Sequence, residues 1–240
     1  MAMGRSVELV AEESPDAIQA QAFDAAKTGD LNALQDALAN GAELEARNAP
    51  YRDTVLNIAI THGNTDLAVW LLEQGADANT GGGGGTALHN AIFRDNLAVT
   101  KLLIAHGADV EARDRHGNTP LMSASRTTPI EILTFLLEQG AVVQVQNKKG
   151  ATPLHYATQT WDEDKAQRLL DRGADPTITD AEGNTPLHIV AKMNLGVRIA
   201  ELLIQHGADR TQKNHEGFTP YDVLSARDHP QQDTVALLKP

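Results

Sequence analysis

Apolar residues recur along the chain in long segments with helical spacing. DLAVWLLEQG (66–75), LAVTKLLIAHG (97–107) and VRIAELLIQHG (197–207) place apolar residues three and four positions apart. This spacing predicts amphipathic helices that are buried along one side. Each of these segments ends in a glycine, which can adopt the left-handed conformation that closes a helix. The pattern therefore predicts a series of similar helices.

A shorter apolar segment precedes each of the long ones and opens with a threonine. The threonines are 32, 33, 33, 33 and 34 residues apart: Thr54, Thr86, Thr119, Thr152, Thr185 and Thr219. A threonine side chain can cap the free amides at a helix start. Four of these threonines precede a proline, which is favoured at the first helical position: Pro120, Pro153, Pro186 and Pro220. The short segments are therefore predicted as a second series of helices.

A Gly-Ala pair marks the end of each long segment and keeps the same period. These glycines are 34, 32, 33, 33 and 34 residues apart: Gly41, Gly75, Gly107, Gly140, Gly173 and Gly207. Two independent landmarks with one period indicate a repeat array. About ten residues separate each glycine from the next threonine, which fits a short extended stretch and a turn.

The segments TPLHYA (152–157) and TPLHIV (185–190), together with the period, resemble the ankyrin repeat. The resemblance covers about residues 16–240. It implies an all-α solenoid of stacked helix-turn-helix units with short β-hairpin loops and a concave binding face. His89, His155 and His188 fill the histidine position of the family, for which the resemblance implies a hydrogen bond to the backbone of the neighbouring hairpin.

The landmarks divide the chain into five internal repeats and two terminal capping repeats, preceded by an N-terminal extension at 1–15. The repeats are expected at about 16–47, 48–81, 82–113, 114–146, 147–179, 180–213 and 214–240. The terminal units depart from the repeat pattern, as expected of units that have one face against water.

Composition narrows the function. The net charge of −12 disfavours nucleic-acid binding, and the absence of cysteine excludes disulfides and thiolate metal sites. No stretch approaches the roughly 18 apolar residues of a membrane span. We expect a cytoplasmic monomer that does not interact with membranes.

The polar residues predict no catalysis, cofactor or metal. The histidines lack the spacing of a zinc-protease helix. Asp162, Glu163 and Asp164 open a long helix, where carboxylates complement the helix dipole. Arg168 takes a position that is apolar in the other long helices. We therefore expect a non-enzymatic module that binds another protein as an adaptor, scaffold or inhibitor.

The resemblance places partner contacts on the hairpin tips and on the exposed side of the first helices. The basic residues Arg115, Lys148 and Lys149 fall on neighbouring tips of an acidic chain, which suggests a partner with an acidic segment. Phe93 and Trp161 stand where small or polar residues are usual and are candidate anchors. The predicted contact residues are Tyr51, Arg52, Phe93, Arg94, Arg115, His116, Arg126, Lys148, Lys149, Gln159, Trp161 and Lys192.

Two alternatives remain open. One is a dedicated inhibitor, such as an immunity protein that occludes the active site of a toxin or another enzyme. The other is a nucleotide-binding protein or enzyme that uses the glycine run Gly81–Gly85. This run lacks the lysine of a P-loop and the spacing G-x-G-x-x-G, and the repeat period passes through it. It is therefore expected to be a bare hairpin tip, the most mobile of the array, which the tip sequence DRHGN would stabilise by restricting the unfolded chain.

Overall fold

The structure is a computed structural model that describes residues 14–194, 197–227 and 229–239. Its helices come in pairs. The first helices of the pairs are α1 (Pro15–Thr28), α3 (Val55–Thr61), α5 (Ala87–Phe93), α7 (Pro120–Thr127), α9 (Pro153–Gln159), α11 (Pro186–Met193) and α13 (Pro220–Ser225). The second helices are α2 (Leu31–Ala39), α4 (Thr65–Glu73), α6 (Leu97–Ala105), α8 (Ile130–Glu138), α10 (Glu163–Asp171), α12 (Val197–Gln205) and α14 (Gln232–Leu238).

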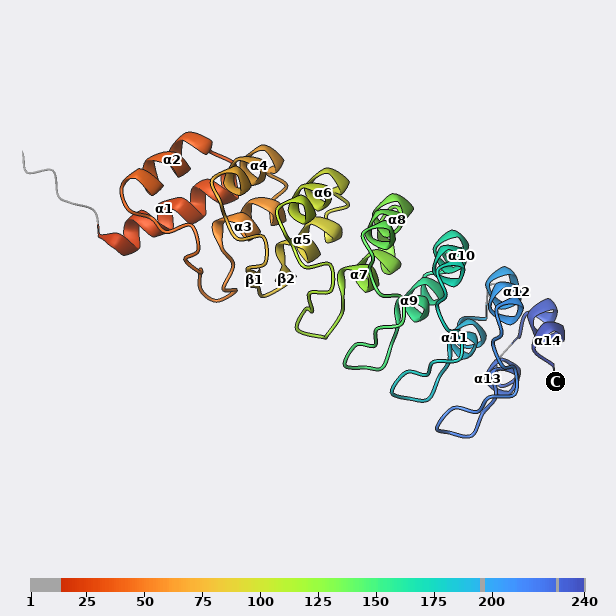
Figure 1. Cartoon of the computed structure of the whole chain (residues 1–240). Helices are drawn as coiled ribbons and strands as arrows, with labels where there is room; N and C mark the ends of the chain where they lie inside the picture. The colour runs from red at the N-terminus through yellow and green to blue at the C-terminus, as the bar shows by residue number, and fades with distance from the viewer. Residues whose placement is uncertain (1–13, 195–196, 228, 240) are drawn as a thin grey trace, which may run out of the picture.

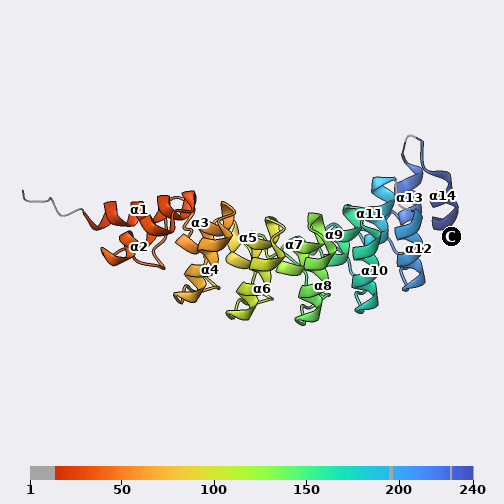
Figure 2. The ribbon, with the colours of Figure 1, turned by 90° about the horizontal axis from the view of Figure 1, so that it is seen from above.

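The pairs stack into one elongated array (Figure 1). First helices form one row, second helices form the other, and the loops between pairs project to one side. Seen from above, α1 and α14 lie at opposite ends of the array (Figure 2). The predicted helical solenoid is therefore confirmed. Ser14 caps α1, which begins at Pro15, so this helix starts within the segment predicted as an extension, whose first 13 residues lie outside the described residues.

Local sequence explains where the helices begin and end. Thr119 Oγ1 accepts a hydrogen bond from the Met122 N–H at 3.4 Å and caps α7. Gly107 follows α6 with a φ of 85°, and its N–H donates to the Ile104 carbonyl at 3.0 Å. The core between the two rows contains one leucine from each of five second helices, all 0% exposed: Leu71, Leu103, Leu136, Leu169 and Leu203.

The glycine run forms a two-stranded antiparallel hairpin. Strand β1 (Gly81–Gly82) pairs with β2 (Gly85–Thr86), with Gly82 opposite Gly85. A Cβ atom on Gly82 would overlap the carboxylate of Asp53, and one on Gly83 would lie 3.2 Å from the Tyr51 carbonyl oxygen. The tip thus packs closely against the preceding loop, and side chains there would meet an obstacle. The expectation that DRHGN would stabilise this tip is therefore revised, while its mobility stays a prediction.

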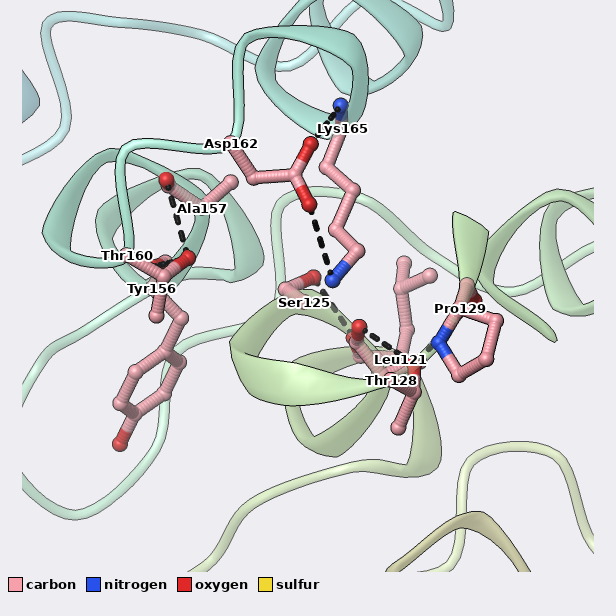
Figure 3. Close-up of polar contacts among 10 residues, drawn as sticks. Leu121, Ser125, Thr128, Pro129, Tyr156, Ala157, Thr160, Asp162 and Lys165 are labelled. Carbon is pink, nitrogen blue, oxygen red and sulfur yellow. Dashed lines mark hydrogen bonds and ion pairs between the residues drawn. The ribbon is translucent and has the colours of Figure 1, made fainter. Parts of the chain in front are cut away.

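Lys165 of α10 occupies a core position that is apolar in other second helices. Eight residues before the closing glycine, those helices carry Leu67, Val99, Ile132 and Ile199. The Lys165 side chain is 2% exposed, and its Nζ lies 3.2 Å from Asp162 Oδ2. Figure 3 shows the ammonium group directed toward Ser125 and Thr128, at the end of α7 in the neighbouring pair. A single carboxylate from the same turn thus accompanies a buried cation.

Trp161 lies in the turn between α9 and α10 with an unusual backbone. Its φ is 59° and its side chain is 45% exposed. The corresponding turns place Gly63 and Asn194 in the same left-handed region, with φ values of 80° and 56°. Glycine and asparagine tolerate this conformation, whereas a bulky side chain does not. The backbone at Trp161 is therefore strained.

Candidate functional site

Three buried histidines join successive hairpins to the first helices. The Nε2–H groups of His89, His155 and His188 donate to the carbonyls of Asn118, Asn184 and Phe218 at 3.0, 3.1 and 3.0 Å. Their Nδ1 atoms accept hydrogen bonds from the N–H groups of the capping threonines, at 3.4, 3.1 and 3.2 Å. Burial lowers the pKa of each imidazole below its ordinary value of 6.5. Both ring nitrogens are thus used, and the structural role implied by the family resemblance is confirmed.

A groove runs between the first helices and the hairpins as three successive hollows. The N-terminal hollow, of about 460 Å³, is lined by Phe23, Tyr51 and Ile58 among others. The central hollow, of about 540 Å³, is lined by Phe93, Arg115, His116 and Arg126 among others. The C-terminal hollow, of about 520 Å³, is lined by Arg126, Lys149, Tyr156, Gln159 and Lys192 among others. Thr61 lines both the first and the second hollow, and Arg126 both the second and the third, so the hollows are adjacent.

One position of the repeat supplies a lining residue in every unit from α3 to α11. Seven residues after the capping threonine stand Thr61, Phe93, Arg126, Gln159 and Lys192, and all five line the groove. Phe93 is 81% exposed. The guanidinium of Arg126 lies 5.2 Å from the ring centroid of Tyr156, within the range of a cation–π contact.

The charged groups of the hairpin tips differ in what they contact. Asp114 Oδ1 accepts hydrogen bonds from the N–H groups of His116 and Asn118, at 2.7 and 2.8 Å. Hydrogen bonds from Asn118 and His116 hold the pKa of Asp114 below its usual value despite partial burial. Asp180 Oδ1 makes the same two contacts, with the N–H groups of Glu182 and Asn184. These carboxylates are therefore occupied within their own turns.

The basic residues of the groove have no such partners. Within the described ranges, the ion pairs involve Lys165, Arg198 and His206, and none involves a cation that lines the groove. Lys148 lines none of the three hollows, and its Nζ donates to the Arg115 carbonyl at 2.9 Å. Arg115 in turn reaches the Gly83 carbonyl at 3.3 Å.

The structure brings together most of the residues predicted as partner contacts. Eight line the hollows: Tyr51, Phe93, Arg115, His116, Arg126, Lys149, Gln159 and Lys192. Four stand outside them. Arg52 lies in the loop before α3 with a φ of 58°, and Arg94 donates to the Thr61 carbonyl at the end of the preceding first helix. Lys148 and Trp161 lie at a tip and in an interhelical turn.

Sequence reasoning missed the lining residues that directly follow the histidine position. Ile58, Asn90, Ser123, Tyr156 and Ile189 share this position and all line the groove. The sequence could have indicated these residues, because their position varies widely among the repeats while the neighbouring positions keep to the repeat pattern. Tyr156 is the most informative of them, since the Arg126 guanidinium lies over its ring.

The described residues contain no group of three or more histidine, aspartate or glutamate side chains that could hold a metal ion. They also contain no helix with the length and apolar character of a membrane span. The glycine run precedes α5, but the helix start is already capped: the Thr86 N–H donates to His89 Nδ1, and the Thr86 hydroxyl lies 2.9 Å from the same atom. These contacts occupy groups that a phosphate would otherwise use.

Comparison with known proteins gives one consistent result. The family of ankyrin repeats matches in three copies, over residues 22–114, 112–180 and 154–239. The crystal structure of the human ASB11 ankyrin repeat domain superposes with a TM-score of 0.76 and 26% identity, and covers 91% of this chain and 98% of that one.

Similar sequences occur within much longer proteins. The Neurogenic locus Notch protein of Drosophila melanogaster is 39% identical over 95 residues, which are 39% of this chain and 4% of that protein. The diacylglycerol kinase iota of Mus musculus is 35% identical over 105 residues, which are 41% of this chain and 10% of that protein. The chain thus matches only a small part of the length of these relatives.

Proposed function

The chain belongs to the ankyrin-repeat family, and we propose that it is a non-enzymatic, monomeric cytoplasmic module that binds one protein partner through an acidic segment along the groove. Ankyrin repeats generally mediate interactions between proteins. The specific proposal rests on the cations that line the groove and lack carboxylate partners in the part of the chain that the structure describes.

Charge distribution supports an acidic partner rather than a basic one. The chain carries a net charge of −12, and Asp114, Asp180 and Glu182 also line the hollows, where their carboxylates accept hydrogen bonds from their own turns. Arg126, Lys149 and Lys192 make no ion pair with these carboxylates in the described residues, so they are the groups that an acidic segment would contact. Such complementarity sets the register of a partner and accelerates its encounter. The net negative charge also disfavours a polyanion such as nucleic acid.

The proposal is tested with two double variants of equal charge change. Lys149→Glu/Lys192→Glu reverses two groove cations, and Lys101→Glu/Arg168→Glu reverses two cations of second helices. Each tagged variant is used to isolate proteins from the native cell, and the affinity of the purified partner is measured by calorimetry at low and high salt. We expect the groove variant to lose the partner and the control variant to retain it.

The same experiment evaluates the rival functions. A partner retained by the groove variant at unchanged affinity would contradict the proposal. A purified partner that is an enzyme, and that loses activity at one-to-one stoichiometry, would identify the chain as a dedicated inhibitor. Saturable binding of ATP or GTP in calorimetry, lost on substitution of the glycine run, would instead support the nucleotide-binding alternative.

A further inference from the structure

Phe93 and Arg126 form a pair of chemically different contacts in the central hollow of the groove. They occupy the same position of consecutive repeats, seven residues after Thr86 and Thr119. Both line the central hollow, one with an apolar ring that is 81% exposed and the other with a guanidinium. The hollow thus presents an apolar contact and a cation side by side.

Arg126 is held ready for a carboxylate. Its guanidinium lies on the ring of Tyr156, and the Tyr156 hydroxyl donates to Asn118 Oδ1 at 3.1 Å and accepts from Asn147 Nδ2 at 2.8 Å. Among the described residues, no acceptor receives a hydrogen bond from Arg126. A guanidinium that is stacked on a ring keeps its edge N–H groups free, and this edge matches a carboxylate in a two-point contact.

The spacing of the backbone positions that carry Phe93 and Arg126 follows from helix packing. α5 and α7 are in contact, and packed helices have axes about 8–10 Å apart. A polyproline-II segment rises about 3.1 Å per residue with three residues per turn, so its residues i and i+3 lie on one face about 9 Å apart. A β-strand would turn side chains i and i+3 to opposite faces. A helix instead brings residues seven positions apart onto one face, about 10.5 Å apart, so the spacing of the two recognised residues distinguishes the two conformations.

We propose that the central hollow recognises an extended, polyproline-II-like segment of the partner in which a carboxylate residue and a large apolar residue stand three positions apart. The carboxylate binds Arg126, and the apolar side chain covers Phe93. This inference rests on the proposed function of the groove and adds the chemistry and spacing of the segment that one hollow would select.

The test is selection of random 12-residue peptides displayed on phage against the full chain. We expect the selected peptides to share aspartate or glutamate three positions from a large apolar residue. Against Arg126→Gln the acidic preference should disappear while the apolar one remains, and against Phe93→Ser the reverse should hold. Arg168→Gln removes an exposed cation of α10 that lines none of the three hollows, and this variant should select the same peptides as the unaltered chain.

A selected peptide, labelled and measured by fluorescence anisotropy, should bind Arg126→Gln about tenfold or more weakly, since a charge-assisted hydrogen bond is lost. Circular dichroism checks that both variants fold. A preference for a spacing of seven would indicate a helical ligand and overturn the inference. Selected peptides that depend on neither Phe93 nor Arg126, or no enriched peptide at all, would also overturn it. The variant of Lys149 and Lys192 tests the groove separately, so the two proposals can fail independently.

Discussion

Lys165 Nζ lies 3.2 Å from Asp162 Oδ2, and this ion pair fills a place that other repeats fill with hydrocarbon. Asp162 also caps α10 by accepting the Lys165 N–H at 3.0 Å. One carboxylate thus starts the helix and neutralises the cation that the helix buries. Because a buried charge is costly without its partner, the stability of this repeat depends on a single side chain that is only partly covered.

Asp162→Asn should destabilise the chain by about 3 kcal/mol, because asparagine can still cap the helix but leaves Lys165 buried without a counter-ion. Lys165→Leu restores the residue type of the other repeats and should be neutral or stabilising. In Asp162→Asn/Lys165→Leu most of the loss should disappear. Urea unfolding followed by far-UV circular dichroism measures all three. Equal losses in the single and double variants would show that the cap, and not the ion pair, carries the effect.

The three buried histidines predict a loss of stability in mild acid. Their pKa values lie below 6.5 in the folded chain, so the unfolded chain binds protons first as the pH falls. The contribution of these histidines to the free energy of unfolding is complete above their pKa in the unfolded chain. It decreases as the pH falls through 6.5 toward their lower pKa values in the folded chain. The melting temperature should therefore decrease as the pH is lowered from about 7.5 to about 5.5.

Asparagine provides the matched control for this prediction, because Asn57 occupies the same repeat position and its Nδ2 donates to the Thr80 carbonyl at 3.0 Å. The triple variant His89→Asn/His155→Asn/His188→Asn should show a flatter dependence on pH over the same range. If its melting temperature falls as steeply as that of the unaltered chain, groups other than these histidines cause the loss.

The strain at Trp161 can be measured by comparing two truncations. Trp161→Gly and Trp161→Ala both remove the indole ring, but only glycine adopts the left-handed backbone without cost. Glycine should therefore be the more stable variant by about 1 kcal/mol in urea unfolding. At the exposed helical residue Glu131 the order should reverse, with alanine more stable than glycine by about 0.5–1 kcal/mol. If alanine is more stable than glycine at both positions, the turn relaxes when the indole ring is removed.

Adjacent glycines of β1 give a sharp test of the close approach at the hairpin. Gly82→Ala places a methyl group against Asp53 and should cost about 1 kcal/mol. Gly81→Ala meets no atom nearer than 3.4 Å and should stay within about 0.5 kcal/mol of the unaltered chain. Thermal melts of both variants decide the matter. Equal stability of the two would show that Asp53 moves aside freely and that the glycines are not required by packing.

The repeat period made the fold predictable, because each landmark has a local physical meaning: Thr119 caps α7 and Gly107 ends α6, as their sequence positions indicate. Contacts between repeats were harder to predict. Arg168 stood out as a charge in an apolar position, yet it is exposed, while Lys165 three residues earlier is buried. Both cations stand at positions that are apolar in other repeats, and the structure shows that Lys165 is the one that is covered.

The groove was predictable to a similar degree. Phe93 was identified from the sequence because the repeat shows that small or polar residues are usual at its position, and Arg126 was identified because the family resemblance places contacts at the ends of the first helices. Tyr156 was not, because its importance arises from Arg126 one repeat earlier, and such a partnership across units has no signal within a single repeat. Lys148 was placed on a tip correctly, but its side chain turns back to the Arg115 carbonyl.

Arg126 lines both the central and the C-terminal hollow of the groove. Two short acidic ligands, one in each hollow, would bring two carboxylates against the same cation, and these carboxylates would repel each other. A single uninterrupted segment can instead satisfy Arg126 once and continue across both hollows. The groove therefore favours one continuous ligand over two separate pieces. If the bound segment of the partner were cleaved between the two hollows, its fragments would bind far more weakly than the intact segment, although the same contact residues would be present.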